Sequence, residues 1–299
     1  MTRQNHKPSK KRQQLISRTF DPQRYRQEHA TQDEDCFKES DNITFLGEPA
    51  LKVEEEEIFR QSLRVLNEIG IPYAVGSAFA RHVYTGIWRE TKDLDVFVKP
   101  DDLKKALEAL EAGGFETEVL VQHWLAKARK KGHVIDLIFG AGHGQFHVDD
   151  KFFRNSIRRE IVGVDTYLVP VEEMIAFAMF VNTRQRYDGS EVAHLIRSRK
   201  GKLDWERLVD RLGDHRQLLL WHLILFDYVY PGHSDYLPQK LMLQLFEEMK
   251  ERWGQNFHPS NAFRGTLIDP FSFMVDIEDW EYQDIRDTEP LVTEEGELL

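Results

Sequence analysis

The stretch Thr-Lys-Asp-Leu-Asp-Val-Phe-Val, residues 91–98, decides how this sequence folds. Polar and apolar residues alternate along it, and successive side chains of a β-strand point to opposite faces. One face holds the aliphatic residues Leu94, Val96 and Val98. Asp93 and Asp95 then lie side by side on the other face, where like carboxylates repel each other unless a positive charge sits between them. Because the aliphatic face fixes the register, the two carboxylates stay together.

A third carboxylate occurs in a later apolar strand. The segment 133–139 reads His-Val-Ile-Asp-Leu-Ile-Phe and places Asp136 among apolar side chains. Three strand carboxylates that converge form an oxygen-only site suited to Mg²⁺, with Mn²⁺ as the alternative. Two such ions about 3.5–4 Å apart would hold the attacking and leaving oxygens of a phosphoryl group. The competing interpretations are a solvated strand edge for the Asp pair and an ion pair with Arg or Lys for Asp136.

Gly76 and Ser77 directly follow the apolar segment 71–75 and precede a predicted helix. A glycine there lets the backbone approach a ligand closely, and the amides at a helix start face an anion. The Ser77 hydroxyl adds a donor for a phosphate oxygen. Arg89 and Lys92 lie just before the Asp pair, where they either meet phosphate charge or neutralise the carboxylates. The order of these features along the chain favours a metal–nucleotide site.

The remaining patterns predict an α/β half followed by a helical half. Helical spacing predicts helices at 53–69, 78–84 and 101–112, and apolar or alternating segments predict strands at 71–75, 93–98, 115–121 and 134–139 with a hairpin at 161–169. After Pro170, helices are expected at 171–184, 190–198, 204–212, 214–229 and 237–253. We therefore expect an α/β domain over residues 51–169 and a helical domain over residues 170–287.

The two ends of the chain differ in charge. The 299 residues carry a net charge of −11, yet residues 1–30 hold eight Lys or Arg against two acids. We predict a flexible basic arm at 1–50, which is a solvated tail or touches RNA or an acidic partner, and an acidic tail at 288–299. No apolar run reaches the ~18 residues of a membrane span, and the polar, basic residues 1–30 contain no apolar stretch that would be expected to serve as a secretory signal. With a single cysteine, a cytoplasmic protein without membrane contact is expected.

Three other features have a simpler interpretation beside a functional one. The basic run 127–131 is most simply a solvated turn, and the alternative is a guide for a nucleic-acid acceptor with Trp124 stacking a base. The glycine-rich loop 140–147 is interpreted as a connector with incidental histidines and not as a zinc site. Asp188 and Glu191 have the spacing of a capping box at a helix start.

The motifs above resemble the nucleotidyltransferase superfamily typified by DNA polymerase beta. That family has a Gly-[Gly/Ser] turn, then Asp-x-[Asp/Glu], then a separate acid, and Gly76-Ser77, Asp93-x-Asp95 and Asp136 match it in order. More closely, the chain resembles bacterial minimal nucleotidyltransferase-like proteins through Tyr-Thr-Gly-x-x-Arg-x-Thr-Lys-Asp-Leu-Asp at residues 84–95. Further shared motifs lie at 123–128, 186–195, 203–208 and 264–267, so the likeness runs from about residue 55 to 287.

The resemblance implies an α/β (α+β) fold with a mixed sheet flanked by helices and a C-terminal helical subdomain that closes the cleft. It implies two Mg²⁺ ions that hold a nucleoside triphosphate such as ATP, while an acceptor hydroxyl attacks the α-phosphorus. By residue matching, Asp93 and Asp95 hold both ions, and Asp136 binds the ion nearer the acceptor and helps to deprotonate it. Gly76 and Ser77 would hold the β- and γ-phosphates.

The predicted function is thus Mg²⁺-dependent transfer of a nucleoside monophosphate from NTP to a hydroxyl of a small molecule, a tRNA end or a protein. One departure favours an alternative: Ala178 stands where relatives often carry a lysine, with Lys92, Arg184 and Arg186 as available substitutes. The alternative is a catalytically weakened, antitoxin-like regulatory member that binds nucleotide. A nucleic-acid-binding module that uses the basic arm is disfavoured by the acidic balance of residues 31–264. The acceptor, the base and the oligomeric state stay open.

Overall fold

The computed structural model describes residues 44–45, 49, 51–254 and 262–288. The chain divides into two units, Met1–Thr44 and Phe45–Leu299, and the second contains almost all of the described residues. The predicted basic arm and acidic tail lie almost entirely outside the described residues and stay predictions. The division of the rest of the chain into two domains at residue 169 also stays a prediction.

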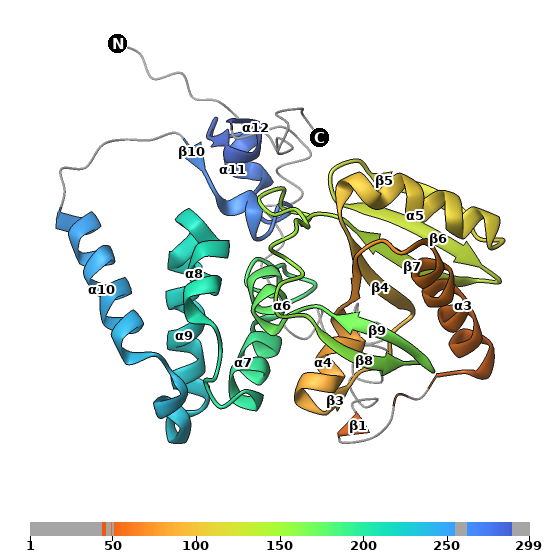
Figure 1. The fold of residues 1–299 in the computed structure, drawn as a ribbon. Coiled ribbons are helices and arrows are strands. Elements are labelled where there is room, and N and C mark those ends of the chain that lie inside the picture. Colours follow the sequence, from red (N-terminus) through yellow and green to blue (C-terminus); the bar gives the residue numbers. More distant parts are fainter. Residues whose placement is uncertain (1–43, 46–48, 50, 255–261, 289–299) are drawn as a thin grey trace, which may run out of the picture. The chain divides into compact units, whose positions relative to one another are not determined.

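A seven-stranded mixed sheet forms the α/β half (Figure 1), with the strand order β5-β6-β7-β4-β2-β9-β8. The pairs β4–β7 and β2–β9 are parallel, and the other neighbours are antiparallel. The seven strands are β2 (Tyr73–Val75), β4 (Asp93–Val98), β5 (Glu116–Val121), β6 (Leu125–Lys130), β7 (His133–Ile138), β8 (Ile157–Ile161) and β9 (Val164–Leu168). Short strands outside this sheet are β1 (Thr44–Phe45), β3 (Ile87–Trp88), β10 (Ala262–Phe263) and β11 (Gln283–Asp284).

Helices α3 (Val53–Ile69) and α5 (Pro100–Ala112) cover one face of the sheet (Figure 1). Helix α3 ends at Gly70, whose left-handed backbone (φ 66°) suits glycine, and Pro100 begins α5, where a missing N–H is no loss. Between the helices and the strands lies a fully buried apolar layer that includes Phe59, Leu63, Leu66, Leu94, Val96, Ala106, Leu110, Ile135 and Leu137. The face of β4 that carries the aspartates therefore points away from these two helices.

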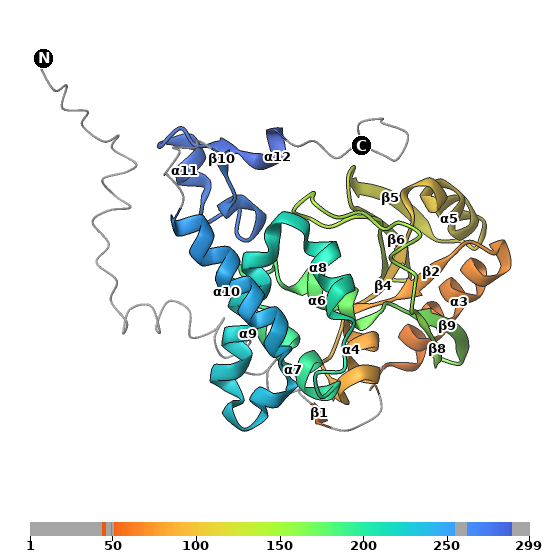
Figure 2. The same cartoon turned by 60° about the vertical axis from the view of Figure 1, so that its left-hand side comes forward.

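The other face of the sheet turns toward α6 (Val171–Ala178), the first helix of the helical half. Phe97, which shares a face with Asp95, contacts Phe177 of α6 with ring centroids 5.6 Å apart. Figure 2 shows the remaining helices of the helical half, which follow α6 in the chain and lie on its side of the sheet. They are α7 (Gly189–Ser198), α8 (Trp205–Leu212), η1 (Gly213–His215), α9 (Arg216–Val229), η2 (Pro231–Tyr236) and α10 (Gln239–Gly254).

Two further parts complete the described chain. Helix α4 (Ser77–Thr85) follows β2 directly and packs against α7 of the helical half. The C-terminal segment contains η3 (Gly265–Leu267), α11 (Met274–Glu278) and α12 (Ile285–Thr288), and its two short strands β10 and β11 pair in parallel.

The structure corrects two predictions of local structure. The basic run at 127–131 is not a solvated turn, because Leu125–Lys130 forms the strand β6 between β5 and β7. The helix predicted at 171–184 ends at Ala178, where the Asn182 side chain donates to the Met179 carbonyl at 2.7 Å and the chain turns away.

The predicted fold class is confirmed: the chain has a mixed sheet flanked by helices, followed by a helical part. Over the described residues, we find no helix with the length and apolar character that crossing a membrane requires.

Candidate active site

Asp95 and Asp136 are direct neighbours across the sheet. Strands β4 and β7 are parallel, and their register sets Asp95 opposite Asp136. On the other side of β7, the antiparallel register with β6 sets Lys127 opposite Asp136. Paired residues share a face, so Asp95, Asp136 and Lys127 form one polar row, and Asp93 lies on the same face two residues before Asp95. The sheet therefore brings the three predicted aspartates together.

A cavity of about 810 Å³ is lined by all three aspartates. Its walls come from α4, β4, β7, α6, the loops beside them and the C-terminal segment. Of the four residues predicted to bind phosphate, Ser77 and Arg89 line this cavity, whereas Gly76 and Lys92 do not. Lys92 is exposed just before β4. Five of the seven predicted site residues therefore share one cavity.

Gly76 has a packing role in this structure. Its N–H donates to the carbonyl of Asp95 at 3.0 Å, so that amide is already used in the strand pairing. A Cβ atom at this position would lie 2.4 Å from Cε2 of Phe97 and 3.2 Å from Cγ2 of Val169. Its backbone has φ −119°, which any residue adopts, so the neighbours and not the conformation require glycine here.

Ser77 has a left-handed backbone with φ 44°, which is uncommon for a residue other than glycine. Strain of this kind persists where the surrounding structure enforces it, and it is concentrated at functional sites. The turn leads from β2 into α4, whose first amides have no carbonyl partner within the helix. The Ser77 side chain also acts on Asp95, because its hydroxyl lowers the pKa of that carboxyl. The start of α4 thus presents N–H donors and a hydroxyl beside the aspartates, as an anion site requires.

The other two carboxylates of the row act on Asp95. Burial raises the pKa of Asp95 to about 7, and the Asp93 and Asp136 carboxylates add to this shift, against the opposing effect of Ser77 and Arg186. A divalent cation among the carboxylates would relieve this repulsion. Carboxylate oxygens are also the ligands that Mg²⁺ and Mn²⁺ favour. The donor set therefore fits a hard divalent cation.

Lys127 holds the third aspartate in this structure. Its Nζ atom lies 2.8 and 2.9 Å from the two carboxylate oxygens of Asp136. Burial raises the pKa of Asp136, and the hydrogen bond from Lys127 opposes that effect. Within the part of the chain that the structure describes, no group of three or more His, Cys, Asp or Glu side chains is arranged to hold a metal ion. Because Lys127 contacts both oxygens of Asp136, a cation at Asp136 would require Lys127 to move away or to share the carboxylate with the ion.

Sequence reasoning missed Lys127 because the charges around it suggested a solvated turn. A signal was nevertheless present in the segment 125–130, Leu-Ala-Lys-Ala-Arg-Lys. Its charged residues Lys127 and Arg129 are separated by one alanine and preceded by Leu-Ala. That alternation is the period of a strand with one polar face. The ion pair also matches the alternative interpretation of Asp136, as a strand acid paired with Lys or Arg.

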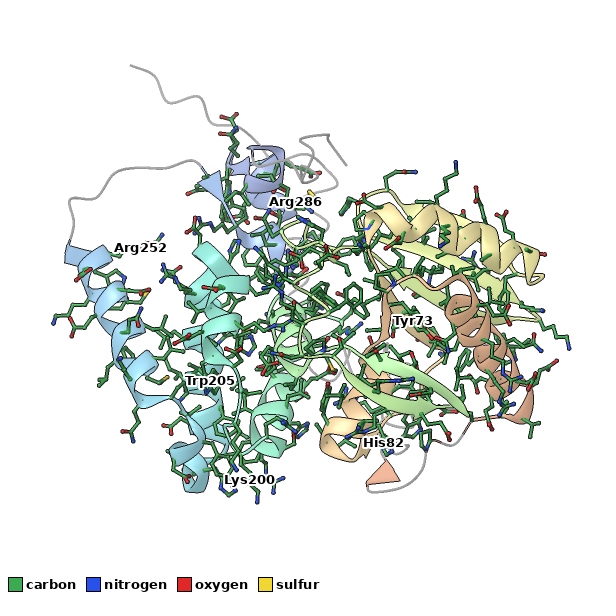
Figure 3. The ribbon with its side chains drawn as sticks, viewed as in Figure 1. Tyr73, His82, Lys200, Trp205, Arg252 and Arg286 are labelled. Carbon is green, nitrogen blue, oxygen red and sulfur yellow. The ribbon has the colours of Figure 1, made fainter. Side chains whose placement is uncertain are left out.

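Among the described residues, four arginines line the cavity, and acids hold most of them. Arg81 pairs with Glu191 of α7 at 2.9 Å, and both side chains are about nine-tenths buried. Burial and the charge of Arg81 lower the pKa of Arg89. The other two arginines pair with acids close to them in the chain: Arg186 with Asp188 and, in the C-terminal segment (Figure 3), Arg286 with Asp284.

The predicted capping box at the start of α7 is wrong. Asp188 makes no side-chain cap to the helix, because its carboxylate accepts from Arg186. Glu191 points across to Arg81 of α4 and not back to the start of its own helix. Both acids therefore position cavity arginines, and the pair Arg81–Glu191 ties the α/β half to the helical half.

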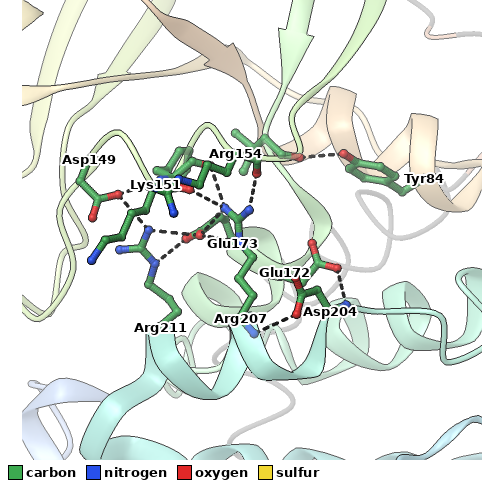
Figure 4. Close-up of polar contacts among 11 residues, drawn as sticks. Tyr84, Asp149, Lys151, Arg154, Glu172, Glu173, Asp204, Arg207 and Arg211 are labelled. Carbon is green, nitrogen blue, oxygen red and sulfur yellow. Dashed lines mark hydrogen bonds and ion pairs between the residues drawn. The ribbon is translucent and has the colours of Figure 1, made fainter.

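A second ion-pair network supports the loop after β7. Figure 4 shows Arg207 and Arg211 of α8 reaching Glu173 of α6. Arg211 also pairs with Asp149 at 3.2 Å, and Arg207 donates to the Lys151 carbonyl at 2.9 Å. Glu173 is almost fully buried, so these arginines satisfy its charge. The network fixes the position of α6, which forms one wall of the cavity.

Comparison with known proteins identifies the family. A protein-family model described as "Uncharacterised nucleotidyltransferase" matches residues 56–226, more than half of the chain. The chain belongs to this family. The predicted recognition is confirmed, and the protein is a nucleotidyltransferase. The C-terminal segment, which adds residues such as Arg286 to the cavity wall, lies beyond the matched region.

Solved structures similar to this nucleotidyltransferase are distant. The solution structure of the antibiotic-resistance factor ANT(2″)-Ia is 13% identical, with a TM-score of 0.42 over 56% of this chain and 94% of its own. The lincosamide antibiotic adenylyltransferase LnuA is 14% identical, with a TM-score of 0.35 over 48% of this chain and 96% of its own. The Megavirus polyadenylate synthase is 13% identical, with a TM-score of 0.35 over 65% of this chain and 40% of its own. No curated protein matches the chain in sequence.

Proposed function

We propose that this nucleotidyltransferase moves a nucleoside monophosphate from a nucleoside triphosphate, ATP being one candidate, to a hydroxyl of an acceptor in a Mg²⁺-dependent reaction. Asp93, Asp95 and Asp136 would hold the metal ions, with Mn²⁺ as an alternative to Mg²⁺. The observation that carries the proposal is the register that sets Asp95 opposite Asp136 in a cavity that Asp93 also lines.

The β2 side of the cavity suits the triphosphate. Ser77 offers a hydroxyl, the start of α4 offers N–H groups, and Arg89 and Arg186 line the same cavity. Bound divalent ions would neutralise phosphate charge and stabilise the charge that develops during transfer. Gly76 contributes by packing, since its N–H is already paired, and Lys92 is not part of the phosphate site in this proposal.

Asp136 would accept the proton of the acceptor hydroxyl. It lies at the β7 side of the aspartate row, away from Ser77, so an acceptor on that side would meet this carboxylate first. Lys127 would keep the Asp136 carboxylate oriented until the substrates bind. Breaking of the bond between the α-phosphorus and the bridging oxygen would release pyrophosphate.

The test is transfer of label from each α-³²P-labelled NTP, with Mg²⁺, to separate pools of metabolites, RNA and protein. We expect one pool to become labelled by the wild type and to stay unlabelled with Asp93→Asn or Asp136→Asn. Asp150→Asn is the matched control, because Asp150 is an exposed acid paired with Lys99 outside the cavity, and it should transfer like the wild type. Equal labelling by Asp136→Asn and the wild type would refute the proposal.

A second candidate function is a regulatory member that binds NTP without transferring it. Ala178 is buried and lines the cavity, at the position where relatives often carry a lysine. Of the three substitutes for that lysine, only Arg186 lines the cavity, whereas Lys92 and Arg184 do not. Binding of Mg·NTP by the wild type with no label in any pool would favour this second candidate. Gain of transfer in Ala178→Lys would then assign the loss to this position.

A further inference from the structure

The two sides of the catalytic cavity carry different chemistry. The strand order places β2 on one side of β4, and β7 and β6 on the other. The β2 side presents Ser77, Arg81 and Arg89, which suit an anion. The β7 side presents Trp124 and Ile138, which suit an uncharged ligand. If the triphosphate takes the cationic side, the second substrate must bind against the β7 side.

The β7 side forms an apolar wall next to Asp136. Ile138 follows Asp136 by two residues and so points to the same face. Trp124, in the connection from β5 to β6, is half-buried and lines the cavity. A Cβ atom at Gly142 would lie 3.6–3.8 Å from Cε2, Cζ2 and Nε1 of Trp124. Gly142 therefore adds no side chain over this edge of the indole, whereas a larger residue there would pack against it.

This wall carries little charge. Among the described residues that line it, Asp136 and His143 are the ionisable ones. Burial, with His215 and His123 nearby, lowers the pKa of His143 to about 3, so its ring is neutral at pH 7. The carboxylates of Asp188 and Glu191 are already paired with arginines. Among the described residues of this wall, Asp136 is the acid that a polycationic acceptor would meet, and Lys127 already holds its carboxylate.

A polynucleotide acceptor is also disfavoured, because the basic run in β6 is engaged elsewhere. Lys127 holds Asp136, and Arg129 pairs with Glu118 at 3.1 Å. Lys130 donates to the Gly113 carbonyl at 2.7 Å. None of these three cations lines the cavity. A chain of phosphates, which needs a series of available cations, would find no such series leading to Asp136 along this strand.

We propose that the acceptor of this nucleotidyltransferase is a small, uncharged hydroxyl compound with a flat ring, which lies against Trp124 while its hydroxyl faces Asp136. An indole offers a large, rigid contact surface for a flat ring, and stacking of this kind tolerates many ring structures. This inference rests on the proposed function, since it assigns the second substrate of the same reaction.

The test measures ring binding and nucleotide binding separately. The protein is saturated with Mg²⁺ and a non-hydrolysable α,β-methylene ATP, and the probes are uridine, a set of neutral aromatic alcohols, a polycationic aminoglycoside and a short oligoribonucleotide. Binding of each probe is followed by saturation-transfer NMR and titration. The variants are Trp124→Ala, Trp124→Phe and, as a matched control, Trp221→Ala, whose exposed indole lies on α9 outside the cavity.

We expect neutral ring compounds to bind the wild type, Trp124→Phe and Trp221→Ala, and to bind Trp124→Ala about tenfold more weakly or worse. Affinity for the nucleotide should stay within about twofold in all variants, because Trp124 lies on the other wall. Preferred binding of the aminoglycoside or the oligoribonucleotide would overturn the inference, as would equal ring binding by Trp124→Ala. Failure of every variant and the wild type to bind the nucleotide would instead refute the proposed function.

Discussion

Substitution of Gly76 by alanine separates a packing role from a phosphate-binding role. The added Cβ atom would lie 2.4 and 2.9 Å from two ring carbons of Phe97. The Phe97 ring cannot move aside easily, because it stacks on the Phe152 ring and contacts the Phe177 ring edge-on, with ring centroids 5.3 and 5.6 Å apart. Overpacking of this kind costs about 1–3 kcal/mol, and a contact this short places the expected cost near the upper end.

The free energy of unfolding of Gly76→Ala should therefore fall by about 2–3 kcal/mol, which lowers the melting temperature by about 4–12 °C for a unit of this size. Gly232→Ala is the control, because a Cβ atom there meets nothing within 4 Å. Phe97→Leu makes room for the new methyl group. The loss in free energy of unfolding of the double variant Gly76→Ala/Phe97→Leu should therefore be smaller, by at least about 1 kcal/mol, than the sum of the losses of the two single variants.

The assay is urea unfolding followed by circular dichroism, combined with titration of Mg·NTP. Packing predicts that nucleotide affinity recovers in the double variant together with stability. An unchanged stability of Gly76→Ala with a weakened nucleotide affinity that Phe97→Leu does not restore would refute the packing argument. Gly76 would then contact the phosphates, as the sequence motif alone predicts.

Three other predictions follow from the ion pairs and a buried histidine. Arg81→Met leaves Glu191 buried without its partner and should cost about 3–5 kcal/mol in urea unfolding, whereas the double variant with Glu191→Met should cost less than that single variant. Burial lowers the pKa of His222 to about 4, so the stability that its neutral ring contributes is complete above pH 6.5 and is lost as the pH falls toward 4. Between these pH values the free energy of unfolding should fall by at most about 1.4 kcal/mol per pH unit, and His222→Gln should reduce this dependence on pH. Lys127→Met leaves the Asp136 carboxylate unpaired and should lower the melting temperature in EDTA. Addition of Mn²⁺ should raise the melting temperature of this variant more than that of the wild type, because Lys127 no longer competes with the ion. An equal rise in both proteins would count against competition between Lys127 and the metal.

Local patterns were sufficient for most of the elements. The strand 93–98 and the helix at 101–112 appear within one residue of their predicted ranges, because a side-chain period and its end signals are properties of neighbouring residues. β6 was missed because Lys127, Arg129 and Lys130 conceal a strand: Lys127 and Arg129 pair with acids on the two neighbouring strands, β7 and β5, and these pairs form only once the sheet is assembled. Glu191 was misassigned for the same reason: its spacing suits a helix cap, but its partner lies 110 residues away.

By itself, the sequence determined that Asp93 and Asp95 share one face of a strand whose other face is buried, since both facts follow from a two-residue period. It also determined that a Gly-Ser turn precedes a helix shortly before that strand. Only the tertiary structure decided that Asp136 lies opposite Asp95, that Lys127 lies opposite Asp136, and that Gly76 makes room for Phe97. The register of β4 with β7 depends on pairing between distant stretches of the chain, which local spacing does not specify. β6 and β7 are consecutive strands, but their register could not be predicted while β6 was taken for a turn.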